Sequence, residues 1–173
     1  MSIQAVLVPE IEVIRTAWPD GSPRAEGALM DGVRHGLWVE WHKAGTMKSS
    51  GEYIVGRREG AFRSWHANGQ LSEEVTYRDD KRHGPSTTWH PNGQRSAERQ
   101  YLMGRLQGPW LSWHPNGAGW AEGEWVDGQA HRTYTCWWPN GQVAIQGDYR
   151  RGETVGVWLY WNEQGELVDT VEY

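Results

Sequence analysis

The chain has 173 residues and a formal net charge of −5; Trp occurs thirteen times, Gly twenty-two times and Phe once. Such a composition argues against one thick aliphatic core and predicts a thin structure whose aromatic side chains stack along a line. The negative charge disfavours nucleic acid, or an anionic membrane, as the main partner. The single cysteine, Cys136, excludes an internal disulfide and fits a reducing compartment.

The first 17 residues differ from the rest of the chain, and we assign residues 1–17 as an N-terminal capping segment. No basic residue precedes their short apolar run, so we expect no signal peptide. No apolar stretch approaches the roughly 18 residues of a bilayer-spanning helix. We therefore expect a cytoplasmic protein. Because an open sheet edge invites pairing, we expect Ile3–Ile14 to cover the first edge as an extra strand.

From residue 18 onward the sequence repeats with a period of 24 residues. A glycine marks every step: Gly21, Gly45, Gly69, Gly93, Gly117, Gly141 and Gly165. Four residues before it stands a tryptophan in six units: Trp41, Trp65, Trp89, Trp113, Trp137 and Trp161. Eight residues after it stands an aromatic residue in six units: Tyr53, Tyr77, Tyr101, Trp125, Tyr149 and Tyr173. This fixed period predicts a repeat domain over residues 18–173, in which each unit packs on its neighbours.

Positions within a unit are counted from this glycine. Glycines recur at +11 and +15, and an aromatic residue recurs at +17. Asp80 replaces the glycine at +11, Arg132 replaces the one at +15, and Ser86 replaces the aromatic residue at +17. We expect the loops that contain Asp80 and Arg132 to differ in shape from the others.

Each unit is typical of a β-hairpin. Runs such as "GLWVEW" are rich in strand-forming residues, and "HPNG" is a turn in which Gly takes the left-handed conformation. No window shows a sustained helical period. The sequence therefore predicts an all-β fold: an elongated repeat array forming a single twisted antiparallel meander of about 14 strands, from about seven stacked hairpins.

Alternation along a strand separates the side chains into two faces. Positions +5 and +7 share a polar, acidic face, and +6 and +8 lie on the other. The tryptophan column and the aromatic residues at +17 are three residues apart. Either both faces carry aromatic residues, or a bulge brings these two columns together.

Ten of the seventeen Lys and Arg residues fall in the glycine loops and predict a basic rim along one long edge: Arg34, Arg57, Arg58, Arg78, Lys81, Arg82, Arg105, Arg132, Arg150 and Arg151.

Nothing in the chain predicts catalysis, a cofactor or a metal site. Four histidines form a column, at 42, 66, 90 and 114, but equivalent residues in adjacent units lie two strands apart, about 9–10 Å. That separation is too long for two ligands of one zinc ion. We expect each histidine to precede a turn and to lay its ring against a tryptophan. No nucleophile elbow, phosphate loop or singled-out carboxylate pair is present.

Several segments resemble MORN repeats, the membrane occupation and recognition nexus motif: "GEYIVGRREGAF" (51–62), "GEWVDGQAHR" (123–132) and "GDYRRGETVGVW" (147–158). The appended "WHPNGQ" is similar to the variant of this repeat found in bacteria. The resemblance covers residues 18–173 and implies an elongated, twisted sheet of stacked hairpins. A fold does not by itself fix a function.

Two classes of function remain open. The resemblance implies a bacterial antitoxin or immunity protein that binds and blocks a partner toxin; the acidic face and the aromatic residues would form the binding surface. The alternative is a membrane-associated or assembly scaffold that binds anionic lipid through the basic rim; the negative charge weakens it. The candidate partner-binding residues are Trp41, Trp65, Trp89, Trp113, Trp137, Trp161, Tyr77, Tyr101, Trp125, Glu74, Glu98, Glu122 and Glu124. A homodimer through a terminal sheet edge is a further hypothesis.

Overall fold

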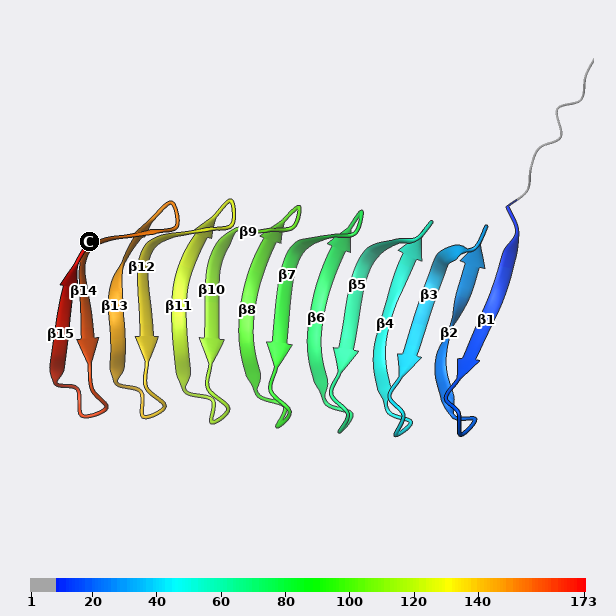
Figure 1. Ribbon diagram of the computed structural model, residues 1–173, viewed down its shortest axis with the longest axis horizontal. Helices are drawn as coiled ribbons and strands as arrows, with labels where there is room; N and C mark the ends of the chain where they lie inside the picture. The colour runs from blue at the N-terminus through cyan, green and yellow to red at the C-terminus, as the bar shows by residue number, and fades with distance from the viewer. Residues whose placement is uncertain (1–8) are drawn as a thin grey trace, which may run out of the picture.

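A computed structural model describes residues 9–173 of this protein as one open antiparallel sheet (Figure 1). Consecutive strands are neighbours from β1 to β15, and only the short β9 lies off this path, paired with β8. The strands are β1 (Ile11–Ala17), β2 (Pro23–Met30), β3 (Val33–Trp41), β4 (Met47–Ile54), β5 (Arg57–Trp65), β6 (Leu71–Arg78), β7 (Lys81–Trp89), β8 (Arg95–Leu102), β9 (Arg105–Leu106), β10 (Gly108–Trp113), β11 (Gly119–Val126), β12 (Gln129–Trp137), β13 (Val143–Arg150), β14 (Glu153–Trp161) and β15 (Leu167–Glu172). The predicted all-β meander is confirmed.

Strand β1 precedes the repeats and pairs with β2 along its whole length, from Ile11 opposite Met30 to Ala17 opposite Pro23. The expected extra strand, Ile3–Ile14, overlaps β1 over Ile11–Ile14. Pro9 and Glu10 lie outside the strand, β1 continues to Ala17, and residues 1–8 lie outside the described part of the chain. The boundary at residue 17 coincides with the end of β1. Whether residues 1–17 act as a separate cap stays a prediction.

The "WHPNGQ" phrase forms the turns of one long edge, which we call the turn edge (Figure 1). In the turn after β3, the backbone N–H of His42 donates to the carbonyl of Thr46, and Gly45 donates back to His42. Gly45 has a φ of 86°, a left-handed conformation that costs glycine little. Glu40 then lies opposite Ser49 and Trp41 opposite Met47, so one residue of β4 is left over as a bulge.

The opposite edge, which we call the loop edge, carries two-residue turns. Asp31 and Gly32 have φ angles of 49° and 80°, as a type I′ turn requires. Asp80 and Arg132 adopt φ angles of 66° and 64°, close to those of the glycines at the equivalent positions. The expectation that these two loops differ in shape was wrong, because both residues take the left-handed backbone conformation of the glycines that they replace.

Cross-strand pairing decides the question of the two aromatic columns. Trp38 lies opposite Gly51, whereas Trp41 lies opposite Met47 beyond the bulge. Since the bulge is in β4 and not in β3, Trp38 and Trp41 keep the alternation of β3 and face opposite ways. Both faces of the sheet therefore carry aromatic residues.

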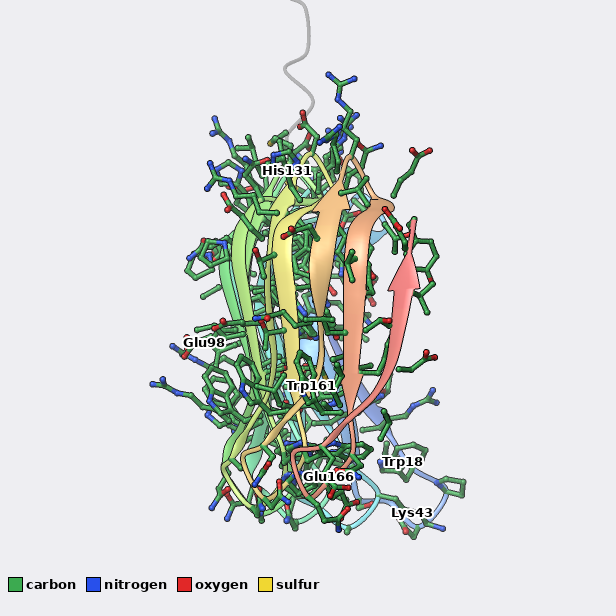
Figure 2. All side chains as sticks on the ribbon, turned by 90° about the vertical axis from the view of Figure 1, so that its left-hand side faces the viewer. Trp18, Lys43, Glu98, His131, Trp161 and Glu166 are labelled. Carbon is green, nitrogen blue, oxygen red and sulfur yellow. The ribbon has the colours of Figure 1, made fainter. Side chains whose placement is uncertain are left out.

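The first face, which we call the ladder face, holds the aromatic residues at +8 and +17. The +8 and +17 rings pack edge to face on one another, as in Tyr53–Phe62 (5.4 Å between ring centroids) and Phe62–Tyr77 (5.1 Å). Neighbouring +17 rings stack, as in Trp110–Tyr134 (6.3 Å). The second face, which we call the tryptophan face, holds the tryptophan column together with the polar residues at +5 and +7. Figure 2 shows side chains on both faces, with His131 at the loop edge and Lys43 and Glu166 at the turn edge.

Glycine at +6 makes room for the ladder. A Cβ atom added to Gly51 would lie 2.2 Å from the ring of Phe62, and one added to Gly147 would lie 2.2 Å from Trp158. In the third unit the sizes are exchanged: Val75 fills the +6 position, opposite Ser86 at +17, and both are buried. This complementary packing gives a thin core one side chain deep, and it agrees with the composition of the chain.

Candidate functional site

The tryptophan face brings together most of the predicted binding residues. All six tryptophans of the column are half-buried, each lying opposite the residue at +2 on the next strand. The glutamates at +5 and +7 lie nearer the middle of the strands on the same face: Glu74, Glu98, Glu122 and Glu124. The column and the acidic positions form two parallel rows along the array.

Tyr77, Tyr101 and Trp125 lie elsewhere. They occupy the +8 position on the ladder face, where Tyr77 is only 7% exposed and Trp125 packs edge to face on Trp110. The sheet separates these three residues from the tryptophan column. The predicted candidates therefore do not form a single surface, and only those on the tryptophan face lie together.

The histidine column holds neighbouring units together. The Nε2 atoms of His42, His66, His90 and His114 lie 2.8–2.9 Å from the backbone carbonyl of the tryptophan one unit further on. Trp138 stands in the histidine position of the next unit, and its Nε1–H donates to the carbonyl of Trp161 at 3.0 Å. Each histidine thus contacts the tryptophan backbone of the next unit, a contact that the sequence did not indicate.

The asparagine of the same phrase makes a second set of bonds between units. The side-chain amide of Asn68 donates to the carbonyl of Pro91, and Asn92 donates to Pro115 in the same way. The other side-chain atom, Oδ1, accepts from the backbone two residues on, as in Gln70. The repeated phrase therefore fixes each turn and binds it to the next.

Three of the four glutamates at +5 are paired with an arginine of the chain on the tryptophan face. Glu26 pairs with Arg15 (3.1 Å), Glu74 with Arg63 (2.7 Å) and Glu98 with Arg95 (2.7 Å). The fourth, Glu122, has no ion pair among residues 9–173. It lies between Leu111 on β10 and Thr135 on β12.

A hollow of about 290 Å³ lies beside this unpaired carboxylate. Trp113, Trp137, Leu111 and Glu122 line it on the tryptophan face. It coincides with Gly119, the residue at +2 and opposite Trp113. The other six units carry a side chain at +2: Pro23, Met47, Leu71, Arg95, Val143 and Leu167. Because Gly119 lacks one, space is left beside two half-buried indole rings.

Most residues of the predicted basic rim form ion pairs within the sheet. Six of its ten members form ion pairs: Arg34, Arg57, Arg58, Arg82, Arg105 and Arg132. The hydrogen bond from Arg58 holds the pKa of Asp80 below its ordinary value. Among the described residues, Arg78, Lys81, Arg150 and Arg151 have no ion pair. A continuous band of uncompensated charge is therefore absent from residues 9–173.

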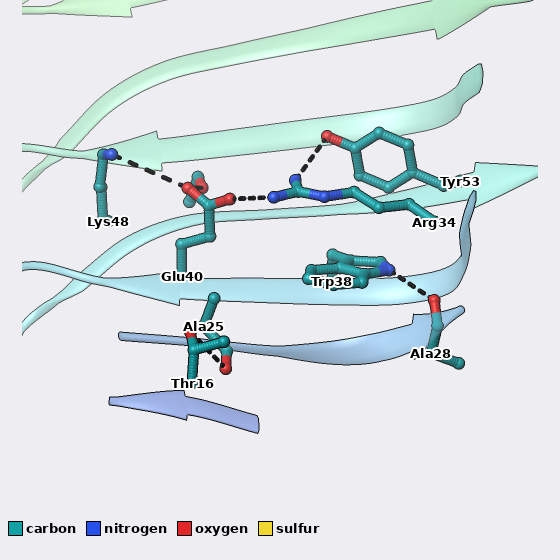
Figure 3. Close-up of polar contacts among 9 residues, drawn as sticks. Thr16, Ala25, Ala28, Arg34, Trp38, Glu40, Lys48 and Tyr53 are labelled. Carbon is teal, nitrogen blue, oxygen red and sulfur yellow. Dashed lines mark hydrogen bonds and ion pairs between the residues drawn. The ribbon is translucent and has the colours of Figure 1, made fainter. Parts of the chain in front are cut away.

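The N-terminal half of the ladder face contains a second hollow, of about 390 Å³. Its Arg34 lies 4.2 Å from the centre of the Trp38 ring and donates to Glu40 (2.8 Å) and to the hydroxyl of Tyr53 (3.2 Å) (Figure 3). Lys48 reaches the same glutamate at 3.8 Å (Figure 3). Glu40 is shared by the two cations, Arg34 and Lys48, and Arg34 also packs on the Trp38 ring, so Arg34 is held by contacts within the sheet.

The described residues contain no cluster of three or more His, Cys, Asp or Glu side chains that could hold a metal ion, and no helix that could cross a membrane. Burial raises the pKa of the Cys136 thiol, which favours its unreactive protonated form.

Comparison with known proteins supports the repeat assignment. The MORN repeat variant matches residues 58–79 and 82–102. These segments are the hairpins β5–β6 and β7–β8, each closed by a "WHPNGQ"-type turn. MORN repeats generally mediate protein or membrane binding and are typically non-catalytic. No curated protein matches the chain.

Proposed function

We propose that this chain is a non-catalytic protein-binding module of the antitoxin or immunity type, which binds and neutralises a partner protein through the tryptophan face. The observation that carries the proposal is that a column of half-buried tryptophans and a row of glutamates lie on the same face of the sheet. Tryptophan is enriched among the residues that dominate binding energy at protein interfaces.

Charge favours a basic partner surface. Eight acidic residues stand at +5 and +7: Glu26, Glu52, Glu74, Glu98, Glu122, Glu124, Asp148 and Glu172. Complementary potential would accelerate encounter with a positively charged partner and would exclude acidic ones. The alternative, binding of anionic lipid through the loop edge, is weakened because most of the loop cations are already paired with carboxylates.

Co-expression tests the proposal. The chain should rescue cells from the toxic product of a neighbouring gene and form a complex with that product. Glu98→Lys should weaken the complex, because it reverses a charge on the tryptophan face. Glu153→Lys makes the same change in β14 at the loop edge and should leave the complex intact. Absence of both rescue and complex would contradict the proposal.

A flotation assay with vesicles that contain anionic lipid separates the two functions. The proposed module should remain in the unbound fraction. Strong binding that is lost at high salt, and lost again when Arg150 and Arg151 are replaced by glutamine, would support the membrane-associated alternative instead.

A further inference from the structure

The fifth unit differs from its neighbour in a way that indicates what its hollow binds. In the fourth unit, Arg95 at +2 extends along the tryptophan face to the carboxylate of Glu98 at +5, with 2.7 Å between Nη1 and Oε1. The fifth unit also has a glutamate at +5, Glu122, but its residue at +2 is Gly119. The carboxylate and the tryptophans remain, and the arginine is missing.

We infer that the hollow formed by Trp113, Trp137, Leu111 and Glu122 receives an arginine side chain of the partner protein. This inference rests on the proposed function and names one contact of it. The space of about 290 Å³ is large enough for such a side chain. The guanidinium would take the place that the chain's own Arg95 has one unit earlier.

The chemistry of the lining suits a guanidinium. Indole rings attract a cation placed over their faces, and arginine stacks on aromatic rings more readily than lysine does. A carboxylate accepts two parallel N–H bonds from arginine. Leu111 is 37% exposed and offers apolar surface for the methylene stem. Glu26, Glu74 and Glu98 already show that a +5 glutamate on this sheet pairs with arginine.

The test titrates the ¹⁵N-labelled 173-residue chain with Nα-acetyl-arginine N-methylamide and follows the indole N–H signals by NMR. Saturable shifts are expected at Trp113 and Trp137. Glu122→Gln should weaken binding about tenfold, since it removes a charge-assisted pair. Nα-acetyl-norleucine N-methylamide, which has a stem but no charge, should cause no saturable shift.

Gly119→Arg supplies the missing side chain from within the chain and should abolish binding of the probe. The strand leaves room for it, because a Cβ atom at residue 119 would have nothing within 4 Å. Met47→Arg is the matched control: it makes a +2 arginine beside Ser50, in a unit without the glutamate, and should leave the titration unchanged.

Shifts spread equally over the tryptophan column, or shifts that persist in Gly119→Arg, would overturn the inference. A third probe, Nα-acetyl-lysine N-methylamide, carries the same charge without the planar guanidinium; if it bound with equal affinity, the assignment of a guanidinium would be overturned. A natural partner that binds the wild-type chain and Gly119→Arg equally well would also refute the inference, while leaving the proposed function in place.

Discussion

At the scale of single residues, the ladder face shows size matching between +6 and +17 in the second and third units. Gly51 accommodates the ring of Phe62, and one unit later Val75 lies opposite Ser86. Gly51→Val should therefore destabilise the protein by about 1–3 kcal/mol through overpacking. Adding Phe62→Ser should recover part of this loss, because the pair then reproduces Val75 and Ser86.

Urea denaturation of the two single variants and the double variant measures the coupling free energy between positions 51 and 62, which we expect at about 1–3 kcal/mol. Gly119→Ala is the control, since its added methyl group meets no other atom within 4 Å. Purely additive effects would contradict the matched packing.

A second residue-scale prediction concerns backbone strain at the loop edge. Val55 holds a φ of 46° in its type I′ turn, a conformation that is unfavourable for a β-branched residue. Val55→Asn should stabilise the protein by about 1 kcal/mol, because asparagine tolerates this conformation. Asp127→Asn changes the same turn position without relieving strain and should have little effect. Thermal and urea midpoints check both; a loss of stability in Val55→Asn would disprove the strain.

At the scale of the element, the "WHPNGQ" phrase joins one hairpin to the next. His90 illustrates the role: its Nε2 atom lies 2.8 Å from the carbonyl of Trp113. His90→Leu should cost about 1 kcal/mol, because it leaves that carbonyl without its donor. His90→Trp should cost less, since Trp138 makes the equivalent bond to Trp161 with its indole N–H.

Both His90 variants lose the imidazole ring, but only His90→Trp keeps a side-chain N–H that can donate to the carbonyl of Trp113. Equilibrium unfolding in urea compares their stabilities. If both variants lose the same stability, the bond between units contributes nothing measurable, and the column serves only to fill space beside the turn.

The hairpins and their period could be predicted from sequence, because turn glycines and strand-forming residues are local signals. The role of His42 could not, because its partner is the backbone carbonyl of Trp65, and a backbone acceptor leaves no trace in the sequence. The separation of Trp38 from Trp41 was left open for a related reason. It depends on which strand carries the bulge, and only the pairing of β3 with β4 shows this.

The candidate site was predicted in part. The acidic positions and the tryptophan column were recognised, but Tyr77 was grouped with them although it is buried on the other face. The hollow at Gly119 was missed. The sequence does mark this hollow, because Gly119 is the one glycine among the larger residues at +2. That glycine could not be interpreted as a binding site from the sequence, because the interpretation depends on the ion pair between Arg95 and Glu98, which only the structure shows.

At the scale of the whole molecule, residues 9–173 form a single-layer sheet with only a thin core, and each unit is stabilised mainly by the units beside it. Trp89 lies between complete units: its carbonyl accepts from His66, and the neighbouring His90 contacts Trp113. Trp161 has complete units on one side only, and within residues 9–173 the single strand β15 lies on the other. Trp89→Ala should therefore destabilise the 173-residue chain more than Trp161→Ala does.

Both side chains are half-buried, so each loss should lie below the roughly 3–5 kcal/mol of a fully buried tryptophan. Chemical denaturation followed by circular dichroism measures the difference. In a linear array a defect at Trp89 interrupts coupling in both directions, so unfolding should also become less cooperative, with a smaller dependence on urea concentration. A defect at Trp161 should loosen only the last hairpin and leave the main transition sharp. Equal losses with equally sharp transitions would mean that stability is shared across the whole sheet.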